Sequence, residues 1–400
     1  MSLWKQPPAK ELIAEVDKKI VALMETYQIV GVSAAVVKEN QVVWANEYGW
    51  SDLDREIAVT EDTVFRIASI SKLFVATSLM QQYEQGKFQL DDDISDYLGF
   101  SFRNPHHPDV PITFRQLLTH TTSLNEDETG GELYVVFSKA SRQSDPPTME
   151  DLLVPGGSLY VDSLWSSFQP GDPQCFAYSN LASMIVAALV ERMSGERFDQ
   201  YCRDHILRPL GMTASDFHVQ ALADINKLGV IYSLEEGQFI AGVDDCKGVK
   251  PESIDWSNVA PGTNGSLFGP QGGLRTNARE LSKFMMAIMR GGSYNGARIL
   301  QPETVELMLS IQWAQEGVDQ GFQAIGLQFH ITDECIPAKR MFGHGGSAYG
   351  LYSGLYFSRE EDFGIIFVTN GSNASAGTRG SFNNVEEALI DTLYEEIVKE

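Results

Sequence analysis

The sequence predicts an α+β fold of the α/β sandwich type, in which one antiparallel sheet is built from both ends of the chain and flanked by helices. Residues 11–48 read as a helix followed by two strands, and residues 325–397 read as strands followed by a helix. The segment between about 86 and 262 shows several helical patterns but few convincing strands. An inserted, mostly helical domain is therefore expected between the two parts of the sheet.

The N-terminal part contributes the first strands and two helices. Apolar residues at helical spacing predict a helix that buries one stripe, and two runs rich in valine and aromatic residues predict strands. Glu39-Asn40 lies between these runs and favours a tight hairpin. The expected elements are a helix at 11–27, strands at 32–37 and 41–48 and, after a polar connection and a segment at 64–67, a helix at 69–85.

Helical spacing dominates the middle of the chain, and apolar strand patterns return near its end. Helices are expected at 114–118, 180–194, 198–206 and 278–290, strands at 325–331, 347–357 and 363–368 with a turn at 358–362, and a last amphipathic helix at 385–397. We assign 7–85 together with 265–400 to a discontinuous sheet domain, 86–264 to the helical domain, and 1–6 to a tail or cloning remnant.

The chain is strongly acidic. Its 400 residues include 54 Asp and Glu against 30 Lys and Arg, a formal net charge of −24. This balance argues against a nucleic-acid partner and against binding to an anionic membrane surface. No run of 18 or more apolar residues occurs, so no membrane span is expected. A small molecule or short peptide is the expected partner, and the oligomeric state is left open.

The spacing of cysteine and histidine predicts neither a metal site nor another cofactor. The four cysteines form no Cys-x-x-Cys pair, and the seven histidines form no His-Glu-x-x-His motif. Free thiols suit a reducing compartment, so the sequence as given favours the cytoplasm. If a leader has been removed, the periplasm or secretion is expected instead.

Ser69 and Lys72 are the first candidates for chemistry. They lie three positions apart at a predicted strand-to-helix junction, which puts Lys72 beside the Ser69 hydroxyl. A serine becomes a nucleophile when a base takes its proton, and a lysine serves as that base only when it is neutral. Burial and the positive end of the helix would lower its pKa. The alternative is an ordinary exposed first turn of a helix.

Tyr178 and Asn180 precede the next long helix, with the spacing Tyr-x-Asn. A phenol could pass a proton between nucleophile and leaving group, and an amide could hold Lys72 and a substrate amide. The alternative is that Asn180 caps the helix and Tyr178 packs at its entry.

The segment His344-Gly345-Gly346-Ser347 precedes a predicted strand. Its glycines indicate a close approach to the backbone. A strand N–H at this place could complete an oxyanion hole with the N–H of Ser69. The alternative is a glycine-rich turn with a histidine whose polar atoms are satisfied.

The three motifs, in this order and a hundred or more residues apart, resemble the serine β-lactamase and penicillin-binding protein superfamily. The closest likeness is to class C β-lactamases, D-alanyl-D-alanine carboxypeptidases and related esterases, and it covers nearly the whole chain. The resemblance implies a β-lactamase/transpeptidase-like fold. It also implies that the cleft lies between the sheet and the helical domain.

The resemblance also implies roles for the residues. Ser69 would be acylated, Lys72 would accept its proton or act through its charge, and Tyr178 would protonate the leaving group and later activate water. Asn180, His344 and Gly346 would bind substrate, and the N–H groups of Ser69 and Ser347 would form the oxyanion hole. Whether Lys72 or Tyr178 is the acylation base is left open, because the two would titrate as a coupled pair.

One departure from the family pattern bears on the substrate. Where β-lactamases of this kind have Lys-Thr-Gly, this chain has His344-Gly345-Gly346, which removes a permanent cation and a hydroxyl. A serine acyl hydrolase with carboxypeptidase or esterase activity is therefore favoured over an efficient β-lactamase, and its substrate is a D-Ala-type peptide, a β-lactam or a small ester. The alternative is a non-catalytic, peptide-binding or self-assembling member of the same fold. An α/β-hydrolase is excluded, since no Gly-x-Ser-x-Gly occurs.

Overall fold

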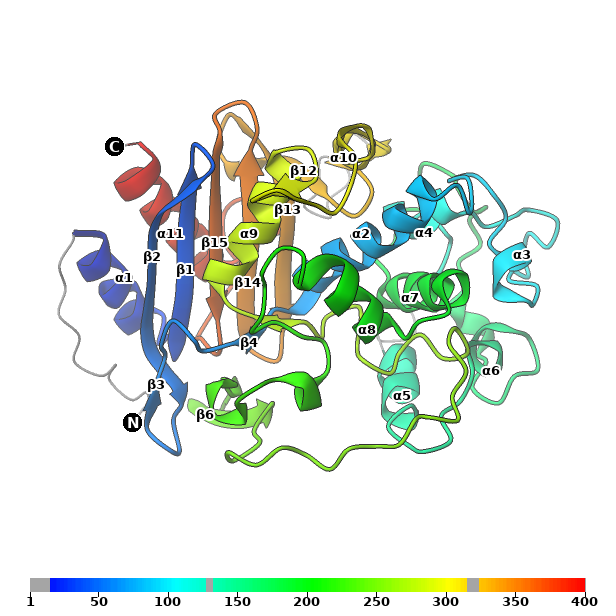
Figure 1. Cartoon of the computed structure of the whole chain (residues 1–400), viewed down its shortest axis with the longest axis horizontal. Helices are drawn as coiled ribbons and strands as arrows, with labels where there is room; N and C mark the ends of the chain where they lie inside the picture. The colour runs from blue at the N-terminus through cyan, green and yellow to red at the C-terminus, as the bar shows by residue number, and fades with distance from the viewer. Residues whose placement is uncertain (1–14, 127–131, 315–323, 400) are drawn as a thin grey trace.

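A nine-stranded antiparallel sheet forms the centre of the computed structural model, which describes residues 15–126, 132–314 and 324–399. Its strand order is β10-β11-β12-β13-β14-β15-β1-β2-β3, so strands from both ends of the chain lie side by side (Figure 1). This confirms the predicted fold class. The strands are β1 Gly31–Lys38, β2 Gln41–Asp52, β3 Ile57–Ala58, β10 Trp313–Ala314, β11 Ala324–Ile325, β12 His330–Ile336, β13 Lys339–Ala348, β14 Leu351–Ser358 and β15 Phe363–Thr369.

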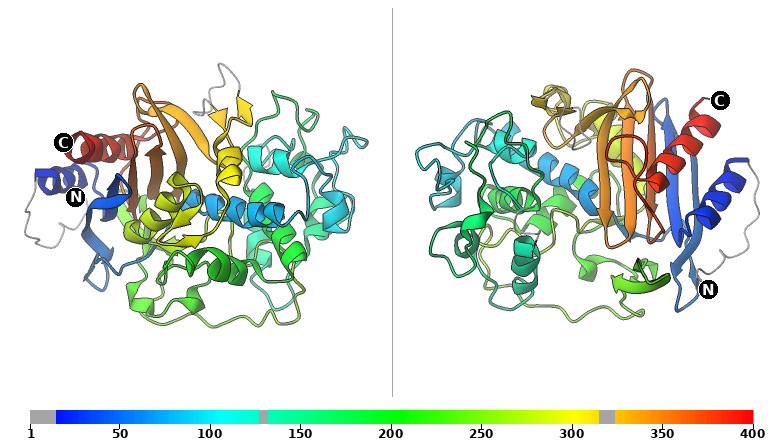
Figure 2. Two further views of the ribbon diagram at one scale, coloured as in Figure 1. Left: turned by 45° about the horizontal axis from the view of Figure 1, so that its top comes forward. Right: turned by 180° about the vertical axis from the view of Figure 1, so that it is seen from behind.

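Helices cover both faces of this sheet. Helices α1 (Glu15–Thr26) and α11 (Asn384–Leu393) pack together on one face, where Figure 2 shows them side by side from behind. Helix α9 (Ala278–Met289) packs on the other face, against β1 and β15. Because both faces are covered, the central strands are buried along their length, and every residue of β15 is buried. That explains why its sequence is a continuous apolar run rather than an alternating one.

The helical part of the chain is organised around α2 (Ser71–Glu84) and α7 (Asn180–Ser194), which pack on each other. Both are buried nearly all round, which is the pattern of helices inside a core. No helix in the described part of the chain is both long and apolar enough to cross a membrane. The other helices are α3 Ser95–Leu98, α4 Phe114–Thr119, α5 Glu132–Ala140, α6 Met149–Leu153, α8 Phe198–Cys202 and α10 Pro302–Leu309.

The two predicted hairpins are present. Glu39 and Asn40, between β1 and β2, have φ angles of 51° and 61°. Positive φ at both central residues is typical of a type I′ turn, whose twist matches that of the flanking strands. Strands β14 and β15 form the second hairpin around the polar turn near Asp362.

Two predicted strands near the end of the chain are wrong in their boundaries. Residues 325–331 are not one strand, because β11 ends at Ile325 and β12 begins only at His330. Residues 347–357 are split by a two-residue turn in which Tyr349 and Gly350 have φ of 57° and 93°. The motif that starts at His344 therefore lies within β13 rather than before a strand.

A hairpin missed from the sequence joins the middle of the chain to the sheet. Strands β5 (Ile231–Glu235) and β6 (Gln238–Val243) pair with each other. The N–H of Tyr232 in β5 donates to the Asn370 carbonyl at 2.8 Å, and the Val230 N–H donates to the Ser51 carbonyl at 2.8 Å. Two shorter pairs are β4 Phe65–Arg66 with β7 Arg275–Thr276 and β8 Ser293–Tyr294 with β9 Ala297–Arg298.

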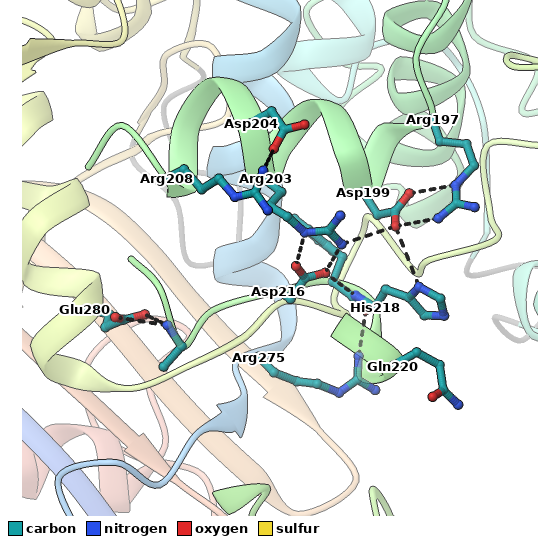
Figure 3. Close-up of polar contacts among 12 residues, drawn as sticks. Arg197, Asp199, Arg203, Asp204, Arg208, Asp216, His218, Gln220, Arg275 and Glu280 are labelled. Atoms are coloured by element: carbon teal, nitrogen blue, oxygen red, sulfur yellow. Dashed lines mark hydrogen bonds and ion pairs between the residues drawn. The ribbon is translucent and has the colours of Figure 1, made fainter. Parts of the chain in front are cut away.

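A buried ion-pair cluster ties the end of α8 to the loop that follows it and to β7 (Figure 3). Asp199 pairs with Arg197 at 2.8 Å, and Asp216 pairs with Arg203 at 2.5 Å. Arg275 of β7 donates to the Phe217 carbonyl at 2.9 Å. Because the acidic members are buried and each is paired, the cluster fixes how this loop packs beside the sheet.

We expect the Phe74–Phe284 contact to be a main stabilising link between α2 and α9. Both rings are fully buried and stack with centroids 4.1 Å apart. Phe284→Ala should lower the free energy of unfolding by about 3–5 kcal/mol, through lost burial and the cavity that remains. Urea denaturation measures this. Phe168, which is 43% exposed, is the matched control, and Phe168→Ala should cost less than about 1 kcal/mol. Equal losses in the two variants would contradict the expectation.

Candidate active site

Ser69 lies in a one-turn 3₁₀ helix, Ala68–Ile70, which leads directly into α2. The regular helix thus begins two residues later than predicted. Hydrogen bonds hold this turn on both sides: the Ile67 N–H donates to the Leu274 carbonyl at 3.0 Å, and the Leu274 N–H donates to the Ser71 hydroxyl at 3.1 Å. Ala68 has a φ of 47°, in the left-handed region that most residues avoid. The turn is therefore held in a conformation that it would not adopt by itself.

Lys72 is fully buried beside Ser69. Its Nζ lies 3.1 Å from the Ser69 Oγ, 2.9 Å from the Asn180 Oδ1 and 2.9 Å from the Gln271 carbonyl oxygen. An amide oxygen and a carbonyl oxygen accept hydrogen bonds, whereas a hydroxyl can also donate one. A neutral amine has two N–H donors and one lone pair. It would satisfy all three neighbours by donating to Asn180 and Gln271 and accepting from Ser69.

Burial lowers the pKa of Lys72 to about 7, and the nearby carboxyl of Glu126 acts in the opposite direction. Glu126 is itself buried, and burial raises its pKa. It accepts hydrogen bonds from the Ser179 hydroxyl and from the Leu181 N–H, the latter at 2.7 Å. Sequence reasoning missed Glu126, because it belongs to a loop without a recognisable pattern.

Tyr178 and Asn180 stand at the start of α7. Ser179 caps this helix by accepting from the Ala182 N–H at 2.9 Å, so the alternative in which Asn180 is the cap is wrong. The Asn180 side chain instead reaches Lys72. The Tyr178 ring centroid lies 4.7 Å from the Lys72 Nζ, so the ring and the amine are direct neighbours.

His120 is a second residue of this site that the sequence did not reveal. It ends α4 in the left-handed conformation, with φ of 57°, and its ring lies 4.6 Å from that of Tyr178. The Ser179 N–H donates to its Nδ1 at 3.1 Å. Burial and the neighbouring Lys72 lower the pKa of His120 well below the usual range, so it is neutral near pH 7. No spacing in the sequence marks it.

Strand β13 lies directly against the turn that carries Ser69. A Cβ atom on Gly346 would come within 2.5 Å of the Ile67 carbonyl oxygen and within 2.3 Å of the Ser353 Oγ. The Ser353 hydroxyl also donates to that Ile67 carbonyl at 2.8 Å. Only glycine permits this approach at position 346. It brings the backbone of Ser347 to the same cavity as Ser69.

His344 contributes a neutral ring to the cavity. Its Nδ1 lies 2.5 Å from the Gly345 carbonyl oxygen, and its ring contacts that of His330, with centroids 4.0 Å apart and the planes tilted by 31°. Burial, followed by the effect of Lys72, lowers the pKa of His344 to about 3. Since a carbonyl only accepts, Nδ1 carries the proton and Nε2 presents a lone pair.

These groups meet at a cavity of about 240 Å³. It holds the predicted Ser69, Tyr178, His344, Gly346 and Ser347, and Asn180 and Lys72 lie behind Ser69. Gly345 also belongs to the predicted glycine-rich motif, and the other five lining residues were not foreseen. The lining residues are Ser69, Tyr178, His330, His344, Gly345, Gly346, Ser347, Tyr356, Ser381, Phe382 and Glu386. Among the residues that the structure describes, no group of three His, Cys, Asp or Glu is arranged to hold a metal ion.

Together these features define a class: α+β proteins in which a serine and a lysine, one turn apart at the start of a buried helix, face a strand of an antiparallel sheet. The family model named Beta-lactamase matches residues 16–388, and the chain belongs to this family. Its fold is that of the β-lactamases and transpeptidases, as the order of the motifs indicated.

Relatives cover most of the chain at low identity. Protein Rv1367c of Mycobacterium tuberculosis is 24% identical over 347 residues, which span 82% of this chain and 80% of that protein. An octameric penicillin-binding protein homologue from Pyrococcus abyssi has a TM-score of 0.71 at 21% identity, covering 95% of this chain and 76% of its own. EstCE1, described as a hydrolase with promiscuous acyltransferase activity, also has a TM-score of 0.71 at 21% identity, covering 95% and 98%. At these identities the solved structures establish the fold alone.

The low pKa of Lys72 predicts a pH-dependent stability. The unfolded chain binds a proton at this side chain up to pH 10.5, whereas the folded protein releases it near pH 7. Stability therefore rises with pH across this window. Between pH 6 and pH 9, the wild type should gain about 2–3 kcal/mol of unfolding free energy relative to Lys72→Met, which lacks this group. Urea denaturation of both proteins at the two pH values measures the difference, and parallel changes would contradict it.

Proposed function

We propose that this protein is a serine hydrolase that cleaves an ester or amide through an acyl-enzyme on Ser69. The observation that carries the proposal is the buried Lys72 amine, which lies 3.1 Å from the Ser69 Oγ and whose pKa is lowered to about 7. Near neutral pH a large share of this amine is uncharged, and an uncharged amine can accept the serine proton. Membership of the Beta-lactamase family supports the same chemistry.

Acylation follows from the arrangement of the side chains. As the Ser69 Oγ attacks the carbonyl carbon, its proton passes to Lys72 or, in the coupled alternative, to Tyr178. The substrate oxygen becomes negative, and the N–H groups of Ser69 and Ser347 stabilise it. Collapse of this intermediate breaks the bond to the leaving group, which takes a proton from Tyr178. Asn180 orients Lys72 throughout.

Deacylation reverses these roles. Tyr178, after giving up its proton, removes one from a water molecule that attacks the acyl carbonyl. The bond to the Ser69 Oγ then breaks, and Ser69 recovers its proton through Lys72. These steps use only side chains and backbone of the chain itself.

The substrate pocket favours a small ester or amide over a β-lactam. His344 is neutral, so the cavity lacks the permanent cation that Lys-Thr-Gly supplies to the family's β-lactamases. Its volume of about 240 Å³ suits a ligand of amino-acid size. His344 and Gly346 would contact the substrate from β13, and the helical region around Tyr178 would close the other side.

Ser69→Ala is the direct test of the acyl-enzyme. The variant should lose p-nitrophenyl acetate turnover by at least about a thousandfold, because it lacks the hydroxyl that contacts the Lys72 amine. Intact-mass spectrometry should show one adduct on the wild type after treatment with a fluorophosphonate and none on the variant. Ser78→Ala, which removes a buried hydroxyl from α2, is the matched control and should keep the adduct.

The outcome also separates the candidate activities. A β-lactam adduct on the wild type would instead point to a protein that recognises penicillins. If neither ester, fluorophosphonate nor β-lactam labels the wild type, the proposal fails, and a non-catalytic binding role takes its place.

The rate should fall in acid because protonated Lys72 cannot accept the serine proton. With a pKa of about 7, its neutral fraction falls about tenfold between pH 8 and pH 6, and kcat/KM for p-nitrophenyl acetate should follow. Burial also raises the pKa of Glu386 in the same cavity to about 7. Glu386→Gln therefore serves as a control, since the same pH profile in this variant assigns the loss to Lys72. A flat profile in the wild type would contradict the assignment.

A further inference from the structure

Glu386 is a buried carboxylate with one oxygen left open to the cavity. It lies in the first turn of α11 and is 7% exposed. Its Oε2 accepts from the Asn383 N–H at 3.1 Å and from the Asn383 Nδ2 at 2.7 Å, which completes the capping box of the helix. Its Oε1 has no hydrogen-bond partner among the described residues. It lies 3.6 Å from the place that a Cβ on Gly345 would occupy.

No cation of the cavity wall balances this carboxylate. The eleven described lining residues include neither lysine nor arginine. Burial is the main cause that raises the pKa of Glu386, and the neighbouring carboxylate of Glu387 raises it further. A buried carboxylate without a counter-ion is costly, and an incoming cation would remove that cost.

A second acceptor in the same cavity has the same preference. His344 donates from Nδ1 to the Gly345 carbonyl, and its Nε2 has no partner among the described residues. The His344 Nε2 is therefore a hydrogen-bond acceptor, as the Glu386 Oε1 is. A ligand that presents an N–H donor would satisfy the Glu386 oxygen, whereas a ligand carboxylate would face its negative charge.

Strand β13 leaves room for the Glu386 carboxylate at Gly345. A Cβ on Gly345 would lie 2.9 Å from the Tyr356 Oη as well as beside Glu386. Tyr356 and Glu386 thus occupy the space that the threonine side chain of a Lys-Thr-Gly motif would need. In this chain the motif lacks both the cation and the hydroxyl, and the Glu386 carboxylate lies beside it.

We propose that Glu386 is the specificity-determining residue of this cavity and that it receives a protonated amine of the substrate. The substrates are then esters or amides that carry a primary ammonium close to the scissile carbonyl, and not compounds that require recognition of a carboxylate. This inference rests on the proposed hydrolase function and names its substrate class.

Small amides of matched size test the proposal on the full-length protein. Alaninamide carries its ammonium on the carbon next to the carbonyl, and 3-aminopropionamide carries it one carbon further away. Propionamide carries no charge, and succinamate carries a carboxylate. Each is measured at pH 7.5 as an inhibitor of p-nitrophenyl acetate hydrolysis, and its binding is measured by calorimetric titration. At least one ammonium compound should bind about tenfold or more tightly than propionamide, and succinamate should bind most weakly.

Variants assign this preference to Glu386. Glutamine at position 386 keeps the capping box, so Glu386→Gln should fold, and it should reduce the preference for the ammonium compound to about twofold or less. Glu360→Gln removes the same charge from an exposed turn and should leave the preference unchanged. Equal binding of charged and neutral amides by the wild type, or a preference that survives in Glu386→Gln, would overturn the proposal.

The two hypotheses fail in different ways. Hydrolysis of p-nitrophenyl acetate that persists in Ser69→Ala contradicts the acyl-enzyme, whatever the order of the amides. Calorimetry gives the order of the amides without any turnover. The wild-type series remains decisive even if a variant does not fold.

Discussion

The burial of the Lys72 amine is the constraint on which the rest of the site depends. Moving its pKa from 10.5 to about 7 costs about 5 kcal/mol of folding free energy, and the surrounding core has to supply it. Its three hydrogen-bond partners come from the turn before α2, from the start of α7 and from the connection at Gln271. Packing α2 and α7 into one core therefore keeps water from the amine and also delivers its partners.

Strand β13 is the second element that the site requires. Its two adjacent glycines have different neighbours. Gly346 lies against the Ser69 turn, and Gly345 lies beside Tyr356 and α11. Successive residues of a strand point to opposite faces, so one short sequence shapes both walls. The close approach at Gly346 aligns the backbone with Ser69, while the approach at Gly345 admits the Glu386 carboxylate.

The sequence allowed much of this to be predicted, because long periodic segments and the order of the three motifs are local signals. The helix at 180–194 and both hairpins occur where they were expected. The turn at Tyr349-Gly350 was missed because the residues around it are apolar on both sides. His120, Glu126 and Glu386 could not be predicted, since each is a common residue at a helix end or in a loop. Their importance comes from burial beside Lys72 or the cavity, which only the tertiary structure creates.

The pairing of β1 with β15 has a consequence for how the protein is made. Val32 is the partner of Thr369, so the centre of the sheet joins segments from nearly opposite ends of the chain. During synthesis the first hairpin leaves the ribosome long before its partner strand exists, with an apolar edge unpaired. Contacts between residues so far apart in the sequence slow folding, and the unpaired, aggregation-prone strands stay exposed for longer. Biosynthesis of this protein should therefore depend on chaperones, and a truncated chain that lacks β15 should aggregate.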